Sequence, residues 1–292
     1  MPLSETKKIL SWLYRIEPFS DLSSFDDLMQ LAAAEVLKKQ PIESELYLER
    51  NIARYWNALL KSQDEDRRLG RTIFLKRQDG AGRRLQWYPH ELSANFKMQR
   101  RATARPAILR IIDQMSPRDY EALACVTISL AGESRFRLTP RGNEGGADFY
   151  VVTQNPGSCH IFFGSHRPLR IIGQTKKYGG PLEISEVRDF ITTIEDVKKH
   201  SPSTERFVPT WFRSASGPLV GWLVSHNGAQ AGALSKAQSH GILTSDSVDI
   251  AEACTFSRLL AANSPNSERA KLLFELVKRC SSDDIESIHS LI

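Results

Sequence analysis

The sequence predicts an α/β protein: a mixed sheet flanked by helices, preceded by an N-terminal mainly helical region. Apolar residues recur at helical spacing through residues 1–66, which indicates packed amphipathic helices. After residue 116, short apolar runs typical of strands are followed by segments with helical periodicity, an order typical of a sheet covered by helices. With 292 residues, the chain is long enough for one sizeable core and a second, smaller region.

The N-terminal region is expected to contain several helices and one hairpin. Ile9, Leu13 and Ile16 recur at helical spacing, and similar stripes continue to residue 66. Residues 71–88 then change to two short strand-like runs around Asp79-Gly80-Ala81-Gly82, a turn sequence that predicts a β-hairpin.

The second region opens with a helix-start signal. Ser116, Pro117 and Asp119 suit the N-cap, first and third positions of a helix that is expected to run to about Gly132. Strands are then expected at 135–139, 147–153, 160–163, 169–175, 218–225 and 242–244, and helices at 185–200, at 229–239 and near the C-terminus. These elements suggest three regions, residues 1–113, 114–262 and 263–292.

Composition is that of an ordinary globular protein, with 41% hydrophobic and 25% charged residues. No apolar run approaches the roughly 20 residues needed to cross a bilayer. The N-terminal segment carries Glu5, Lys7, Lys8 and Arg15 where a signal peptide would have an apolar core. A cytoplasmic protein is therefore expected.

The four cysteines are widely scattered and form no C-x-x-C pair, so neither a disulfide framework nor a structural zinc site is predicted. Cys159, His160 and His166 lie close together, but their spacing fits no known zinc motif, and we interpret them as structural.

Positive charge is concentrated between Arg67 and Arg110. This segment contains twelve Lys or Arg residues and only two acidic residues, although the whole chain has a net charge of only +5. Phe74, Trp87 and Phe96 are interleaved with these basic residues. The pattern fits a solvated face, and it also fits a surface that tracks phosphates and stacks bases. The predicted nucleic-acid contacts are Arg71, Lys76, Arg77, Arg83, Arg84, Arg100 and Arg101.

Asp148, Gln174 and Lys176 are the candidate catalytic residues. Side chains alternate along a strand, so Gln174 and Lys176 are expected on one face, with Thr175 on the other. If the strand of Asp148 is the neighbour, a carboxylate, an amide and an ammonium converge at one end of the sheet. Carboxylate and amide oxygens suit Mg²⁺, and a nearby lysine can orient a water and offset charge on a phosphate. These groups together predict hydrolysis of a phosphodiester.

The order of these motifs resembles the Mrr-like branch of the PD-(D/E)xK restriction endonuclease superfamily. The resemblance rests on Gly146-Ala147-Asp148, on Gln174-Thr175-Lys176 and on the run "PLEISEVRDF" at 181–190. It continues through "PLVGWLVSHNGAQAGALSKAQSHGILTSDSVDIAEA" and spans roughly residues 116–255. The 26 positions between Asp148 and Gln174 exceed the family's short hairpin, which implies an elongated connection.

The resemblance implies a restriction-endonuclease-like fold and a Mg²⁺- or Mn²⁺-dependent nuclease. Asp148 would be the metal-binding carboxylate, Gln174 a second metal ligand and Lys176 the catalytic lysine. Glu121, on the helix that opens the domain, matches an acidic residue that often completes the metal site, and Glu144 is a nearby alternative. Lys177 is interpreted as a solvated strand end.

Function is expected to be cleavage of duplex DNA, with a role in restriction or antiviral defence and a homodimer or larger assembly. Two alternatives stay open. One is a catalytically silent DNA-binding or scaffold protein, since the neutral Gln174 supplies less charge to a metal than Glu would. The other is a nuclease of RNA or single strands. A separate partner subunit is also compatible with the sequence.

Overall fold

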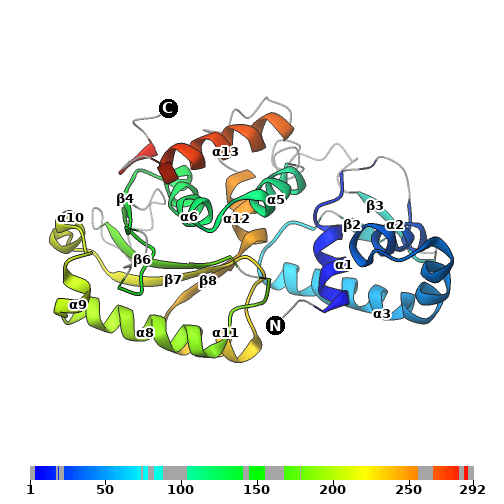
Figure 1. The fold of residues 1–292 in the computed structure, drawn as a ribbon, viewed down its shortest axis with the longest axis horizontal. Coiled ribbons are helices and arrows are strands. Elements are labelled where there is room, and N and C mark those ends of the chain that lie inside the picture. Colours follow the sequence, from blue (N-terminus) through cyan, green and yellow to red (C-terminus); the bar gives the residue numbers. More distant parts are fainter. Residues whose placement is uncertain are drawn as a thin grey trace. The chain divides into compact units, whose positions relative to one another are not determined.

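The computed structural model describes residues 4–17, 19, 23–73, 75–77, 82–87, 104–140, 145–154, 168–177, 179–255, 266–282 and 286–288. The chain divides into two compact units, Pro2–Arg110 and Ile111–Ile292, called here the N-terminal and C-terminal units. Figure 1 shows the elements of each. No helix in the described ranges is long and apolar enough to cross a membrane.

The N-terminal unit combines helices with a small antiparallel sheet, and the hairpin predicted from the sequence is present. Its helices are α1 (Glu5–Leu13), α2 (Phe25–Leu37) and α3 (Pro41–Arg68). Its strands are β1 (Ser23–Ser24), β2 (Leu75–Arg77) and β3 (Arg84–Trp87), in the order β1-β3-β2. The side-chain oxygens of Ser4 and Ser24 accept backbone N–H groups and so cap α1 and α2.

Three residues, 38–40, join α2 to α3, and this is the length of the turn in a helix-turn-helix. Lys38 takes a left-handed conformation (φ 56°) that ends α2. Buried side chains from the helices and the sheet form one core, which includes Leu13, Phe25, Tyr55 and Leu85.

The C-terminal unit is built on a five-stranded mixed sheet of order β4-β5-β6-β7-β8. The strands are β4 (Ser134–Leu138), β5 (Phe149–Thr153), β6 (Leu169–Lys176), β7 (Leu219–Ser225) and β8 (Leu243–Asp246). Pairing is antiparallel from β4 to β6 and parallel from β6 to β8. The mixed α/β architecture predicted from the sequence is therefore confirmed.

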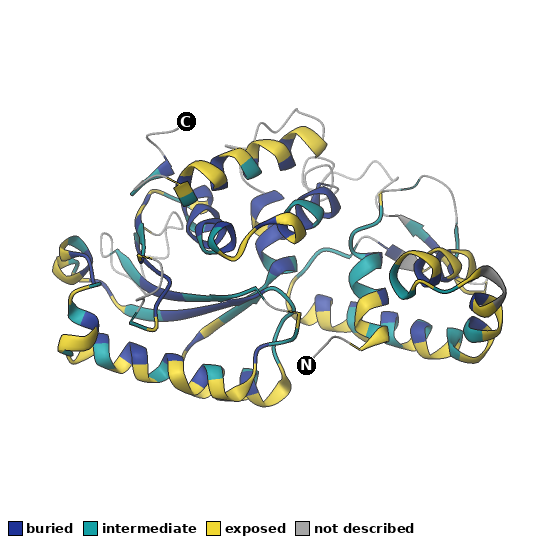
Figure 2. Cartoon of the chain, in the orientation of Figure 1, coloured by how far each residue is buried: buried dark blue, intermediate teal, exposed yellow. Residues whose placement is uncertain are grey.

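Helices cover both faces of this sheet (Figure 1). One face packs against α8 (Ile184–Lys198) and α11 (Ala231–Ser239), and the other against α6 (Pro117–Ala131) and α12 (Ser247–Thr255), while α13 (Asn266–Ser282) packs on α6. The short helices α9 (Pro202–Glu205) and α10 (Thr210–Ser214) lie between α8 and β7 in the sequence. Figure 2 shows the sheet as largely buried, whereas the outer side of α8 is exposed.

Most predicted elements are present with shifts of a few residues at their ends. Ser116 and Asp119 form the expected capping box at the start of α6. The strand expected at 160–163 lies outside the described residues. Helix α5 (Arg105–Gln114) was not predicted, and the boundary between the units falls within it. The three regions expected from the sequence, with boundaries at 113/114 and 262/263, remain a prediction.

Strand alternation assigns side chains to the two faces. Ile172 on β6 and Leu223 on β7 pack in one cluster with Val187 and Phe190 of α8. Gly221 lies on the same face, where an added Cβ would come within 2.3 Å of the Ile194 side chain. Gln174, Lys176 and Ser225 follow at even steps along these strands, so they lie on the face that α8 covers.

Candidate active site and basic hairpin

Asp148 lies at the start of β5, directly before Phe149, which pairs with Gly173 of β6. Its backbone N–H donates to the carbonyl oxygen of Gly173 (2.9 Å). Its carboxylate oxygen Oδ2 accepts the backbone N–H of Thr175 (2.5 Å) and the Thr175 hydroxyl (3.0 Å). Asp148 is only 6% exposed. The prediction that its strand is the neighbour of the Gln174 strand is therefore confirmed.

Backbone conformation and limited space explain the two glycines that precede Ala147 and Asp148. Gly145 and Gly146 have positive φ angles of 52° and 84°, which favour glycine. A Cβ on Gly146 would lie 2.1 Å from Oγ1 of Thr193 on α8, so no other residue fits. Thr139 completes the support, because its N–H and hydroxyl both donate to the carbonyl oxygen of Asp148.

Gln174 presents a buried amide oxygen on β6. Its Oε1 is buried and has no hydrogen-bond partner among the described residues. A buried polar atom without a partner costs free energy, about 1–3 kcal/mol in mutational data. Such an atom fits a ligand that the chain itself does not supply, and an amide oxygen suits a hard divalent cation.

Lys176 lies two residues further along β6, and its ammonium faces Glu186 near the start of α8. The Nζ to Oε1 distance is 3.9 Å, and the two side chains are 18% and 21% exposed. The other carboxylate oxygen of Glu186 accepts the backbone N–H of Glu183 (2.8 Å) and so caps α8. Glu186 lies in the run at 181–190, and no role was predicted for it from the sequence.

Ser225 is the register partner of Lys176 on the parallel strand β7. It is 3% exposed, and its hydroxyl has no hydrogen-bond partner among the described residues. Gln174 and Ser225 therefore present two unsatisfied oxygens on the face of the sheet that carries Lys176.

Glu121 lies on α6 and forms an ion pair with Arg118 (2.6 Å), with only 14% of its side chain exposed. It is thus a largely buried glutamate with a partner on its own helix. Arg118 also donates to the carbonyl oxygen of Thr139 (2.8 Å), which links this pair to the residue that supports Asp148.

The pKa of Cys125 is affected by both Glu121 and Asp148. Burial raises the pKa of the Cys125 thiol well above its ordinary value, and Cys280, Glu121 and Asp148 all add to the rise. Both carboxylates therefore lie near this thiol. Among the described residues, no three His, Cys, Asp or Glu side chains are grouped so that they could hold a metal ion.

Lys177 corrects one interpretation. It was expected to be a solvated strand end, but its Nζ donates to the carbonyl oxygens of Asp113 (3.1 Å) and Met115 at the end of α5. Burial lowers the pKa of Lys177 below its ordinary value, and Asp113 and Asp119 oppose that effect. Lys177 therefore caps a helix end, unlike Lys176.

The predicted nucleic-acid contacts differ in their surroundings. Three of them, Arg77 on β2, Arg83 directly before β3 and Arg84 on β3, are exposed and define the basic hairpin. Arg83 lies 3.7 Å from Asp26, a weak exposed pair. In contrast, Arg71 is 13% exposed and pairs with the buried Asp66 (3.3 Å), so its guanidinium already has an internal partner.

Several predicted residues cannot be placed. Arg100 and Arg101 lie outside the described residues, and the side chain of Lys76 is not described. The same holds for the aromatic and metal-type residues noted in the sequence: Phe74, Phe96, Glu144, Cys159, His160 and His166.

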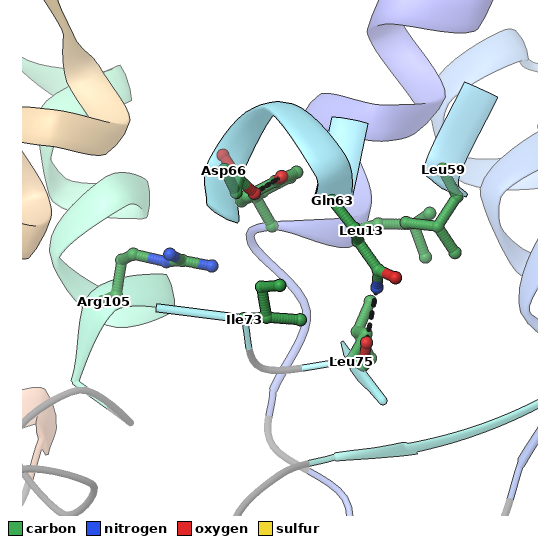
Figure 3. Close-up of a pocket in the computed structure, with 8 residues that line it drawn as sticks. Leu13, Leu59, Gln63, Asp66, Ile73, Leu75 and Arg105 are labelled. Carbon is green, nitrogen blue, oxygen red and sulfur yellow. Dashed lines mark hydrogen bonds between the residues drawn. The ribbon is translucent and has the colours of Figure 1, made fainter. Parts of the chain in front are cut away.

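A pocket in the N-terminal unit is lined by residues that include Tyr14, Gln63, Asp66 and Arg105. Figure 3 labels the last three of these. The volume of the pocket is about 20 Å³, enough for a single water and far too small for a nucleobase. Arg105 donates to the carbonyl oxygen of Thr72, and its guanidinium lies 5.0 Å from the centre of the Tyr14 ring. Burial raises the pKa of Asp66 above its ordinary value, although Tyr14 and Arg71 oppose the rise. Hydrogen bonds and an ion pair thus link α1, the end of α3 and Arg105 around this pocket.

The C-terminal unit, which carries Asp148, Gln174 and Lys176, is similar to a known family of catalytic domains. Residues 112–204 match the family model of the Mrr-type restriction endonuclease catalytic domain. The chain therefore contains a catalytic domain of the Mrr-like restriction endonuclease family. No curated protein matches the chain.

Three solved structures are similar to the chain. One is the restriction endonuclease MspJI in complex with a 27-mer oligonucleotide, with 15% sequence identity and a TM-score of 0.39. The match covers 70% of this chain and 41% of the MspJI chain. The DNA modification-dependent restriction endonuclease AspBHI has 17% identity and a TM-score of 0.41, covering 68% and 46%. Restriction endonuclease FokI has 13% identity and a TM-score of 0.36, covering 86% and 43%. The chain thus spans less than half the length of each.

Proposed function

We propose that the protein is a metal-dependent DNA endonuclease that hydrolyses phosphodiester bonds. The observation that carries this proposal is the Mrr-type catalytic domain with Asp148, an unsatisfied Gln174 oxygen and Lys176 on adjoining strands. Its role is restriction, or defence against foreign DNA, in the cytoplasm.

The residues present fit a divalent cation such as Mg²⁺ or Mn²⁺. Mg²⁺ is commonly held by one or two carboxylates and keeps waters or substrate phosphates in its other positions. Asp148 and the unsatisfied Oε1 of Gln174 would hold it. When bound, the metal would lower the pKa of a coordinated water and stabilise the negative charge of the transition state.

The protein's own groups prepare the reaction. The two hydrogen bonds from Thr175 fix the orientation of the Asp148 carboxylate. Lys176 supplies a positive charge beside the scissile phosphate and orients the attacking water. Glu121, which is paired with Arg118, is a further acidic group of the proposed metal site.

DNA contact outside the catalytic domain is made by the basic hairpin and, in the undescribed segment, by Arg100 and Arg101. A helix-turn-helix often binds DNA with its second helix, but the first turns of α3 expose Glu43, Glu45 and Glu49. These acids repel phosphates, whereas Arg77, Arg83 and Arg84 attract them. The proposed contact surface is therefore the hairpin and not the start of α3.

Cleavage of supercoiled plasmid with Mg²⁺, Mn²⁺ or EDTA tests this function. Wild-type protein is compared with Asp148→Ala and Lys176→Ala. We expect metal-dependent nicking or linearisation that both substitutions abolish. Cleavage that survives both would place the active site elsewhere.

Two other candidates keep specific support. The neutral Gln174 favours a silent DNA-binding or scaffold protein, which would bind DNA in a salt-sensitive way without cutting it under any metal. The basic and aromatic residues of the 67–110 segment favour single-stranded or RNA substrates. Parallel digests of duplex DNA, single-stranded DNA and RNA distinguish this candidate. Sedimentation with and without DNA tests the proposed homodimer.

A further inference from the structure

Glu186 is fixed at the start of α8 by contacts that do not involve Lys176. One of its oxygens accepts the backbone N–H of Glu183 and closes the first turn of the helix. The preceding residue, Leu182, pairs with the loop after β7, since it donates to the carbonyl oxygen of Gly228 (2.8 Å) and accepts from Gln230 (3.0 Å). The helix start and its carboxylate are therefore anchored to the sheet.

Lys176, by contrast, carries its charge on a flexible four-carbon chain. Holding such a chain in one conformation costs up to about 2 kcal/mol of rotamer entropy. The fixed carboxylate of Glu186 lies 3.9 Å from the ammonium, and both side chains are about four-fifths buried. Water screens a partly buried pair less than an exposed one, so the attraction favours conformations of the lysine that keep its ammonium near Glu186.

We propose that Glu186 is a positioning residue that holds the ammonium of Lys176 in its working position. This inference rests on the proposed nuclease function, in which Lys176 acts on the attacking water. Glu186 uses one oxygen to cap α8 and the other to orient the lysine. The rigid start of α8 thereby fixes the flexible end of a catalytic side chain.

Glu186→Gln tests the proposal, because its amide oxygen still accepts the Glu183 N–H while the negative charge near Lys176 is lost. We expect kcat for plasmid cleavage to fall at least tenfold, whereas KM and the Kd for DNA change less than twofold. The matched control is Glu195→Gln on the outer side of the same helix, where Glu195 pairs with the exposed Lys199 (3.5 Å). The control should cleave like wild type.

A second measurement does not depend on activity. Urea unfolding of Lys176→Met, Glu186→Gln and the double variant gives the coupling between the two side chains. Coupling together with a loss of kcat supports the proposal. Coupling in a protein that never cleaves shows that the pair exists and that the nuclease function is what failed. Zero coupling, or an unchanged or increased kcat in Glu186→Gln, overturns the proposal.

Discussion

The carboxylate of Asp148 accepts two hydrogen bonds from Thr175, the residue between Gln174 and Lys176. Thr175 points to the face opposite its two neighbours, yet its backbone N–H and its hydroxyl both reach Asp148. The middle residue of the Gln-x-Lys motif therefore links the two strands on which the candidate site depends.

Thr175→Val should weaken this link without changing the shape of the side chain. The hydroxyl donates to a carboxylate, and such bonds contribute about 1.5–3 kcal/mol. We expect a loss of about 2 kcal/mol in the free energy of unfolding, measured by urea denaturation, together with slower plasmid cleavage. Thr175→Ser keeps the hydroxyl and should stay close to wild type. If the two variants have equal stability and cleave equally fast, the Thr175 hydroxyl does not contribute to the link between the strands.

Ser225→Ala should make the protein more stable. The Ser225 hydroxyl is buried without a partner in the described part of the chain, so alanine removes a polar atom that folding leaves unsatisfied. We expect the free energy of unfolding to rise by about 1 kcal/mol. The matched control is Ser129→Ala, since the buried Ser129 accepts the hydroxyl of Ser134 (2.7 Å) and its loss leaves that donor only the longer bond to the carbonyl oxygen of Gly132 (3.3 Å). If both variants destabilise the protein, Ser225 has a partner in the folded state.

Part of this site could be predicted from local sequence. Alternation along one strand was enough to place Gln174 and Lys176 on the same face, and the capping residues of α6 marked its start. These signals act within a few positions of the chain. The glycines before Asp148 were noted as a motif, but only the structure shows the close approach of Thr193 that requires Gly146.

The remaining features depend on contacts that sequence spacing does not encode. Glu186 reaches Lys176 because the loop at Leu182 pairs with the segment after β7. Lys177 resembles Lys176 chemically, and its partners are backbone carbonyls of residues more than sixty positions earlier. The strand β1 has two residues, too few for any periodicity. Long-range pairing decides each of these cases.

Neutralising the basic hairpin should weaken DNA binding in a salt-dependent way. Each phosphate contact contributes about 0.9 to the slope of log Kobs against log salt. Removing two charges with Arg83→Gln and Arg84→Gln should therefore reduce the steepness of the slope by about 2, measured by fluorescence anisotropy over a salt series. Lys198→Gln with Lys199→Gln at the end of α8 removes the same charge and serves as control. An unchanged slope in the hairpin variant would move the contact surface elsewhere.

Acid should destabilise the C-terminal unit through Asp119, the capping residue of the helix that carries Glu121. Burial alone would raise the pKa of Asp119, but hydrogen bonds from Lys278, Ser116 and Ser281 outweigh it and lower the pKa to about 2. A carboxyl group whose pKa is lower in the folded state stabilises the protein above its unfolded pKa of about 3.9. That contribution is lost as the pH falls toward the folded value.

Asp119→Asn tests this linkage. We expect the variant to be about 2 kcal/mol less stable than wild type at pH 7, since it loses the charge that Lys278 faces across 2.7 Å. The difference should shrink between pH 4 and pH 2, where wild-type Asp119 takes up its proton. Asp189→Asn, at an exposed position on α8, removes the same charge and serves as the control. A constant stability difference across this range, measured by urea unfolding at each pH, would show that Asp119 acts through its shape and not its charge.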